Sequence, residues 1–203
     1  MKNAVMAFAI LSTSLQIAGQ HNELPENKKL MFGFNIGANY SNVLAPGNPS
    51  ARSNNGGGFS LGLVMSESIS EQLFLSPKAE LSFNDCNIVY SNAANAESIY
   101  PIYPVSINIM MHIAYRLKKS KRSAYLLIGP NARVPLVENR VTNVYGNNPD
   151  LAIDLGFGFE KLLKYFCLAP EFRYSIGLLN VNKDPGLDHV YFHNITFVLN
   201  FKG

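Results

Sequence analysis

The strongest constraint on the fold is a strict alternation of apolar residues with small or charged ones. The segment 166–178, FCLAPEFRYSIGL, places Phe172 and Tyr174 on one face of an extended chain and Glu171 and Arg173 on the other. A helix turns by about 100° per residue and would scatter these apolar side chains around its whole circumference. The segment is therefore predicted to be a strand with one apolar face and one small-or-charged face.

The same period of two recurs along the chain. Seven further segments follow it: 30–43, 59–65, 73–83, 104–116, 123–134, 151–160 and 190–201. The total is even, and most of these segments are close to the roughly 9 to 11 residues that cross a bilayer as a tilted strand. We predict an all-β fold, an eight-stranded antiparallel transmembrane β-barrel that occupies residues 30–203.

Alternation alone does not say which face points outward, because a soluble lipocalin-like barrel has the same period. Two observations favour the membrane. The polar face is rich in Gly, Ser, Ala and Asn, which suits the narrow interior of eight strands. The connections are short after the second, fourth and sixth strands and long after the others, which is the pattern of periplasmic turns and outer loops. Charged residues make up 15% of the chain, against about 25% in soluble domains.

The N-terminus predicts export. Lys2 precedes an apolar run at 4–11, and the small residues Ala18 and Gly19 follow, so we expect a signal peptide at 1–20 and a short periplasmic segment at 21–29. Beyond residue 25 no run of about 18 apolar residues occurs, so no transmembrane helix is expected. The expected location is the bacterial outer membrane, with its lipid as a partner. The net charge of +3 is too small and scattered to indicate nucleic-acid binding.

Charged residues fall on the face that would point into the barrel. Segments 75–83 and 168–176 align position for position, with Lys78 where Glu171 stands and Glu80 where Arg173 stands. Their strands would lie half a turn apart, so opposite charges can meet across the interior, where an unpaired charge is costly. We predict a structural network of lumenal charges from Lys78, Glu80, Arg133, Asp154, Glu160, Glu171 and Arg173. The predicted lipid-facing side chains include Phe157, Phe159, Phe172, Tyr174 and Ile176.

Two prolines and two cysteines complete the strand analysis. Pro77 and Pro170 remove ladder donors in a barrel without a free edge, so each is predicted to sit at a bulge. Cys86 and Cys167 have no CxxC or metal-type spacing; both are expected to behave as small apolar residues, with a disulfide between them left open.

Several function classes can be weighed from the residues. A small lipid-modifying barrel enzyme would need Ser, His and an acid at the outer rim, and the candidates are Ser50, Ser53, Asp188 and His189. Loop residues of these types are common, so the sequence favours a non-enzymatic protein. His112 would face the lumen without metal-type neighbours. Inward Phe74, Met110 and Tyr125, together with the charges, would leave no room for an open channel. No catalytic, cofactor or metal site is predicted.

Five segments taken together resemble the PorT/SprT family of Bacteroidetes outer-membrane barrels. They are FGFNIGANYSNV, FSLGLVMSESISEQLFLSPKAELSF, YLLIGPNARVPL, LGFGFEKLLKYFCLAPEFRYSIGLLNV and ITFVLNF, and the block ending at Asn180 is the most distinctive. The resemblance implies a small barrel similar to OmpX and OmpA, a role in type IX protein secretion, and other secretion-system components as partners. One departure is the C-terminus, where Lys202 and Gly203 follow Phe201. A structural or adhesive OmpX-like barrel is the alternative.

Overall fold

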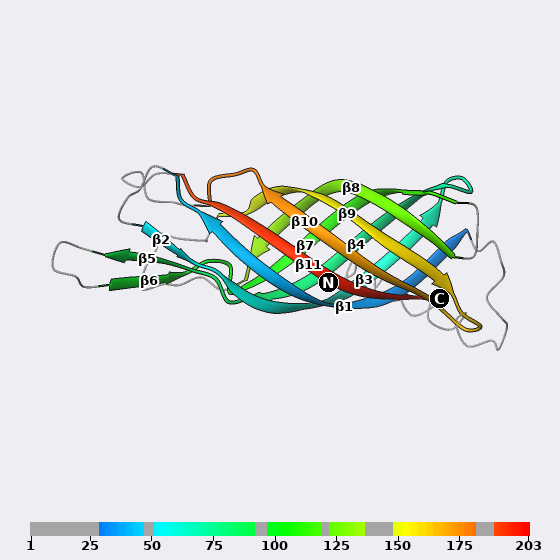
Figure 1. Ribbon diagram of the computed structural model, residues 1–203, viewed down its shortest axis with the longest axis horizontal. Coiled ribbons are helices and arrows are strands. Elements are labelled where there is room, and N and C mark those ends of the chain that lie inside the picture. The colour runs from blue at the N-terminus through cyan, green and yellow to red at the C-terminus, as the bar shows by residue number, and fades with distance from the viewer. Residues whose placement is uncertain (1–28, 47–50, 92–96, 119–121, 137–147, 182–188) are drawn as a thin grey trace, which may run out of the picture.

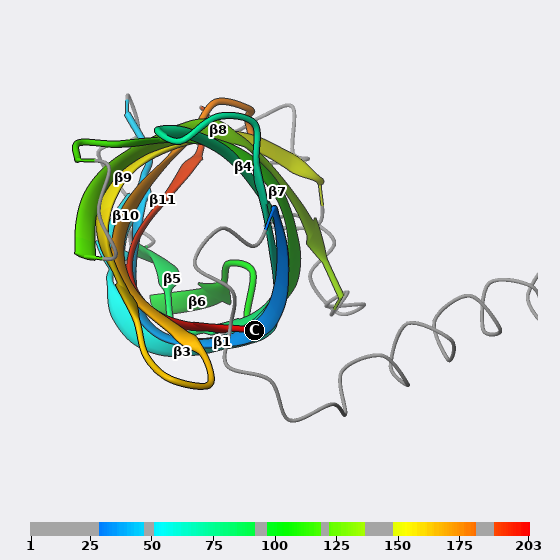
Figure 2. The same ribbon diagram turned by 90° about the vertical axis from the view of Figure 1, so that its right-hand side faces the viewer.

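Eight strands close into one antiparallel barrel in the computed structural model, which describes residues 29–46, 51–91, 97–118, 122–136, 148–181 and 189–203. Around the wall they follow the order β1-β11-β10-β9-β8-β7-β4-β3 (Figures 1 and 2). The strands are β1 (Leu30–Leu44), β3 (Gly56–Ser68), β4 (Leu73–Asn84), β7 (Val105–Arg116), β8 (Arg122–Pro135), β9 (Asp150–Leu162), β10 (Cys167–Gly177) and β11 (Tyr191–Lys202). The predicted signal peptide 1–20 and nearly all of the segment 21–29 lie outside the described residues.

Closure of the barrel follows from the pairing of its first and last strands. β1 runs antiparallel to β3, and β11 runs antiparallel to β10. β1 also pairs with β11, so that Tyr40 lies opposite both Gly57 and Ile195. Each barrel strand is therefore paired on both sides, and no strand is left at an edge. The predicted eight-stranded antiparallel barrel is confirmed.

The period of two in the sequence becomes an inside and an outside. Leu63 is 69% exposed and Phe157 58% exposed on the outer wall, whereas Ser60, Asn35 and Asn108 are buried in the lumen. An eight-strand barrel is only wide enough for its own side chains, which explains the small and amide residues on its inner face. The apolar side chains are therefore left on the surface of the molecule.

The bulges predicted at the prolines are wrong. Pro77 pairs with Met111 of β7, and on the β3 side the ladder skips from Leu75–Glu67 to Lys78–Val64, three residues on both strands. Pro170 likewise pairs with β11 and interrupts the β9 ladder without changing its register. Each proline thus costs local pairing on one side only, and no extra residue is inserted.

Two predicted outer loops contain strands that the sequence analysis missed. β2 (Ala51–Asn54), β5 (Asn87–Ser91) and β6 (Glu97–Pro101) form a separate sheet in the order β2-β5-β6. In Figure 1 this sheet projects beyond the barrel at the end that carries the long connections, called here the long-loop end. The opposite end, with the connections 69–72, 117–121 and 163–166, is called the short-turn end. Strands of four or five residues are too short for their alternation to stand out from a loop.

An apolar cluster, called here the cap, lies at the long-loop end. It consists of Val43, Cys86, Ile88, Ile102, Tyr103, Val181, Val190 and Phe192, all buried. Tyr103 holds a left-handed backbone (φ 48°) and packs edge-on against Phe192, with ring centroids 5.2 Å apart. A non-glycine residue in this region is uncommon and persists only where its surroundings hold it. The cap therefore fastens the projecting sheet to the barrel wall.

Both cysteines are free thiols. Cys86 is buried in the cap and Cys167 at the start of β10, so the disulfide left open by the sequence is not formed. Burial, and to a lesser degree the negative charge of Asp85, raises the pKa of the Cys86 thiol to about 12. No helix among the described residues is long and apolar enough to cross a membrane.

Candidate functional site

The seven residues of the predicted charge network all lie inside the barrel. Each of them is buried, and Arg173 keeps only 2% of its surface exposed. They do not form one continuous network. Their ion pairs and hydrogen bonds separate into a central cluster, an Asp154 cluster, and one cluster toward each end of the lumen.

The central cluster joins opposite walls. Lys78 of β4 forms an ion pair with Glu171 of β10. Arg173 of β10 donates from both terminal nitrogens to the carboxylate of Glu80 in β4, at 3.0 Å and 2.6 Å. Arg173 also lies 3.6 Å from Glu171. Two cations thus face two carboxylates, and the fork-to-fork geometry of the Arg173–Glu80 pair is the strong form of an ion pair. These contacts cross from the third barrel strand to the seventh.

Neutral side chains complete the coordination of the two carboxylates. The Tyr125 hydroxyl donates to Glu171 at 2.8 Å, and the Asn35 amide donates to Glu80 at 2.8 Å. A buried ion pair is tolerated only when its remaining lone pairs are also satisfied. The cluster therefore draws on β1 and β8 as well as on β4 and β10, and it ties four strands together across the lumen.

A second cluster surrounds Asp154 of β9. Its carboxylate lies 2.9 Å from His112 Nε2 and accepts a hydrogen bond from the Ser175 hydroxyl at 2.6 Å. The Asn131 amide nitrogen donates to both carboxylate oxygens, at 3.1 and 3.2 Å. Ser175 bonds the carboxylate and not the imidazole, so the group lacks the nucleophile–base contact of a catalytic triad. Within the described part of the chain, no group of three or more His, Cys, Asp or Glu residues could hold a metal ion.

The remaining charges lie toward the two ends. Near the long-loop end Arg133 donates to Asp150 at 3.0 Å and to the carbonyl of Phe192 at 2.9 Å. Near the short-turn end Glu160 is held between Arg116 and Lys202, both at 2.6 Å.

Four of these charged or titratable partners were outside the predicted network. His112, Asp150 and Lys202 are buried inside the barrel, and Arg116 reaches inward to pair with Glu160. Their place on the polar face of their strands was the available signal, but the sequence did not say which carboxylate or cation each would meet. Lys202, which follows Phe201, continues the polar face of β11 and pairs with Glu160.

Aromatic side chains fill the lumen between the charges. Arg116 lies 4.2 Å above the ring of Phe74, and Lys202 lies 5.4 Å from it, while Tyr125 meets the same ring edge-on. Phe74, Tyr125 and Met110 are all buried, as the sequence predicted for inward residues. The lumen is packed with side chains, and its chemistry is that of a structural ion-pair core.

The rim residues considered for an enzyme do not assemble in the described structure. The Ser53 hydroxyl donates to the carbonyl of Val43, and the His189 ring stacks on Tyr191 with centroids 6.2 Å apart. Ser50 and Asp188 lie outside the described residues. A Ser–His contact, the first requirement of such an enzyme, is not formed between the two residues that are described.

The outer wall is a continuous apolar surface. All five predicted lipid-facing residues point outward; Phe157, Phe159, Phe172 and Tyr174 are exposed and Ile176 is partly covered. Exposed apolar side chains occur on every barrel strand, including Phe34, Leu63, Ala79, Ile109, Ile128, Phe157, Phe172 and Phe197. Soluble monomers rarely expose more than a few hundred Å² of contiguous apolar surface. This surface is suited to the hydrocarbon core of a bilayer.

Comparison with known proteins adds little beyond the barrel shape. No family model matches the chain, and no curated protein does. OprG from Pseudomonas aeruginosa is 10% identical, with 86% of this chain and 95% of that one covered and a TM-score of 0.49. Ail of Yersinia pestis, solved with the heparin analogue sucrose octasulfate, is 12% identical over 87% and 100%, with a TM-score of 0.47.

Neisserial surface protein A is similar to the same degree. It is 13% identical over 85% of this chain and 97% of that one, with a TM-score of 0.46. Likenesses this distant carry no statement about activity, and the fold assignment rests on the strand pairing described above. The resemblance to the PorT/SprT family stays a prediction.

Proposed function

We propose that the protein is a non-enzymatic barrel of the bacterial outer membrane. The observation that carries this proposal is the apolar outer wall on a closed barrel. In hydrocarbon each unsatisfied backbone polar group costs several kcal/mol, and a closed barrel has no edge strand whose row of backbone groups lacks a partner strand. In water the same wall would expose aromatic and aliphatic side chains on all eight strands. The two environments therefore make opposite demands, and this wall meets those of lipid.

A transport pore is not the role we propose. The centre of the lumen is crossed by the Lys78–Glu171 and Arg173–Glu80 pairs, and the long-loop end carries the apolar cap. Opening a path would require breaking buried ion pairs, each of which costs about 3 to 5 kcal/mol when one partner is removed. A rigid barrel with a filled lumen is better suited to present its loops outside the membrane than to let a solute pass.

The finer proposal is that this surface serves type IX protein secretion. Its support is the sequence resemblance to the PorT/SprT family, and its partners would be other components of that machinery. The projecting β2-β5-β6 sheet gives the barrel a shaped surface outside the membrane, fastened by the cap. The same projecting sheet favours a second candidate, a structural or adhesive surface barrel.

Two experiments test the proposal in order. Membrane fractionation and gel migration with and without heating test the barrel: we expect outer-membrane recovery and heat-modifiable migration. Recovery in the soluble fraction would refute the membrane assignment.

Deletion of the gene, followed by a comparison of secreted proteins, then separates the two roles. We expect secreted cargo to be retained in the deletion strain and released again on complementation. Normal secretion together with reduced surface attachment would favour the adhesive barrel and exclude the secretion role. A strain complemented with Ser53→Ala and His189→Ala should behave as wild type; loss of function in that strain would revive the enzyme hypothesis.

A further inference from the structure

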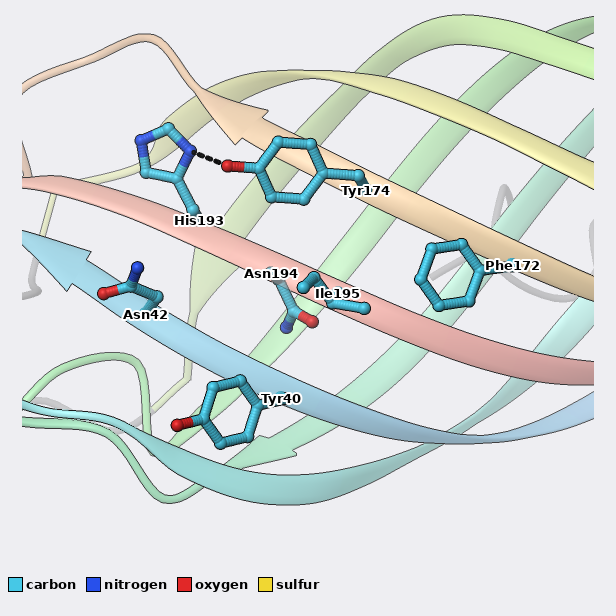
Figure 3. A pocket seen from close by; sticks show the side chains of 7 residues that line it. All are labelled: Tyr40, Asn42, Phe172, Tyr174, His193, Asn194 and Ile195. Carbon is cyan, nitrogen blue, oxygen red and sulfur yellow. Dashed lines mark hydrogen bonds between the residues drawn. The ribbon is translucent and has the colours of Figure 1, made fainter.

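A groove of about 340 Å³ runs over the outer wall near the long-loop end. It crosses β1, β11 and β10 and is lined by Tyr40, Asn42, Phe172, Tyr174, His193, Asn194 and Ile195 (Figure 3). Its volume lies at the lower end of the roughly 300 to 1,000 Å³ usual for small-molecule sites. The Asn194 side chain itself points inward and bonds Asn84, so the groove is framed by the six other side chains.

The register of the three strands creates the groove. Ile195 of β11 lies opposite Tyr40 of β1 on one side and opposite Tyr174 of β10 on the other. A branched aliphatic residue between two larger aromatic ones leaves a trough, because side chains of paired residues stand side by side on the same face of a sheet. Figure 3 shows the two tyrosines on either side of Ile195, with Phe172 continuing the same wall.

The groove is apolar at one end and polar at the other. Phe172 and Ile195 lie toward the middle of the barrel, whereas Asn42 and His193, which are paired in register, lie nearer the long-loop end. The Tyr174 hydroxyl lies 3.2 Å from His193 Nδ1, and the two rings stack at an angle of 24°. We assign the Tyr174 hydroxyl as the donor to Nδ1, which places the imidazole proton on Nε2, where it can donate to a ligand.

The polar end of the groove offers hydrogen-bond donors to an anion. Among the described residues that line the groove there is no carboxylate. Behind the wall, the guanidinium of Arg133 donates to the carbonyl of Phe192, the residue before His193, at 2.9 Å, although Arg133 is also paired with Asp150. The imidazole N–H, the Asn42 amide and the Tyr40 hydroxyl are donors, and several donors at one site are how proteins hold phosphate oxygens.

We propose that this groove binds one phosphorylated lipid of the outer leaflet. An acyl chain would lie over Ile195 and Phe172 between the tyrosines, and the headgroup phosphate would accept hydrogen bonds from His193 and Asn42. The proposal rests on the membrane assignment made above, because only a membrane-embedded wall would meet the acyl chain of such a lipid. It fits the position of the polar end, since tyrosine at the headgroup level is usual for membrane barrels.

The test uses the purified, detergent-solubilised full-length barrel and native mass spectrometry. The probe is lipid A carrying its phosphates, with dephosphorylated lipid A and inorganic phosphate alone as comparisons. We expect one lipid A to remain bound through delipidation. Ile195→Trp, which fills the trough, should lower retention at least about tenfold, the equivalent of roughly 1.4 kcal/mol. Ile113→Trp, on the exposed wall of β7, is the matched control and should retain lipid as wild type.

The polar end is tested separately. His193→Leu should weaken the binding of phosphorylated lipid A by about tenfold, because it removes one hydrogen bond to a charged group. The binding of dephosphorylated lipid A should stay unchanged. Equal retention by all variants, or equal binding of both lipids by wild type, would overturn the proposal. Binding of inorganic phosphate as strong as that of the lipid would reduce the groove to an anion site and also overturn it.

Heat-modifiable migration separates the two levels of failure. A variant at Ile195 or His193 that migrates as a folded barrel but loses its lipid supports the groove. If Ile195→Trp does not fold, Ile195→Phe is used in its place. Wild type that folds and fractionates with the outer membrane but retains no lipid refutes the groove alone. Wild type found outside the membrane refutes both the groove and the function from which it follows.

Discussion

Replacing Arg173 with alanine should destabilise the barrel by about 3 to 5 kcal/mol, the usual cost of removing one partner from a buried ion pair. The central cluster holds two cations, Lys78 and Arg173, against two carboxylates, Glu80 and Glu171. The substitution removes both bonds to Glu80, at 3.0 and 2.6 Å, and leaves the cluster with one uncompensated negative charge. Among the described residues, the Asn35 amide, at 2.8 Å, would be the one remaining donor to Glu80.

A second substitution should recover part of this loss. Glu80→Gln in the Arg173→Ala background removes the orphaned charge, while Lys78 continues to neutralise Glu171. The two substitutions should therefore be non-additive by about 1 kcal/mol or more, as expected within one network. Arg116→Ala is the matched control, because Arg116 bonds Glu160 and not Glu80, so its effect should add to that of Glu80→Gln.

The free energies come from urea titration of the folded barrel in lipid vesicles. The chain has no tryptophan, so unfolding is best followed by far-UV circular dichroism and by the loss of heat-modifiable migration. Strictly additive losses for Arg173→Ala and Glu80→Gln would mean that β4 and β10 do not meet across the lumen, and the ion-pair reasoning would be wrong. If the pair instead carries a proton for function, secretion would stay low in the double variant after folding has recovered; we expect both to recover together.

Three further predictions probe the wall, the lumen and the cap. Phe172→Arg should lower the free energy of unfolding by about 2 to 4 kcal/mol if the residue lies near the bilayer midplane, while Phe172→Leu should lower it by less than about 1.5 kcal/mol. Equal losses for the two variants in vesicles would contradict the outward assignment of Phe172. Gly158→Ala should cost about 1 to 3 kcal/mol, because its Cβ would lie 2.3 Å from the Tyr125 ring, whereas Gly57→Ala, whose nearest neighbour is 3.8 Å away, should change stability by under about 0.5 kcal/mol. Cys86 should resist maleimide in the folded protein near neutral pH, since burial raises the pKa of its thiol to about 12, and should react once urea unfolds the chain; fast labelling of the folded barrel would disprove a closed cap.

Alternation along the sequence was enough to predict the barrel strands and their two faces. Side-chain parity in a strand is a local property, so Phe172 and Arg173 must point to opposite sides whatever the rest of the chain does. The even strand count and the alternating loop lengths then led to a closed barrel. The internal alignment of 75–83 with 168–176 also predicted which two strands would form ion pairs across the lumen, because strands three and seven of eight necessarily face each other.

Some features depended on the three-dimensional stagger of the strands. Glu160 meets Arg116 and Lys202 because β7, β9 and β11 reach the same height at the short-turn end, and sequence spacing carries no information on that height. The prolines interrupt the ladders without a bulge because the neighbouring strand on the other side keeps their register.

The sheet β2-β5-β6, the cap and the outer groove were likewise decided only by tertiary structure. Each of them is assembled from segments far apart in the chain: Val43, Ile102 and Phe192 in the cap, and Tyr40 and Ile195 in the groove. Such contacts depend on how far each strand is shifted against its neighbour when the barrel closes. Local periodicity determines which side of the wall a residue occupies, but only closure determines which residues it meets there.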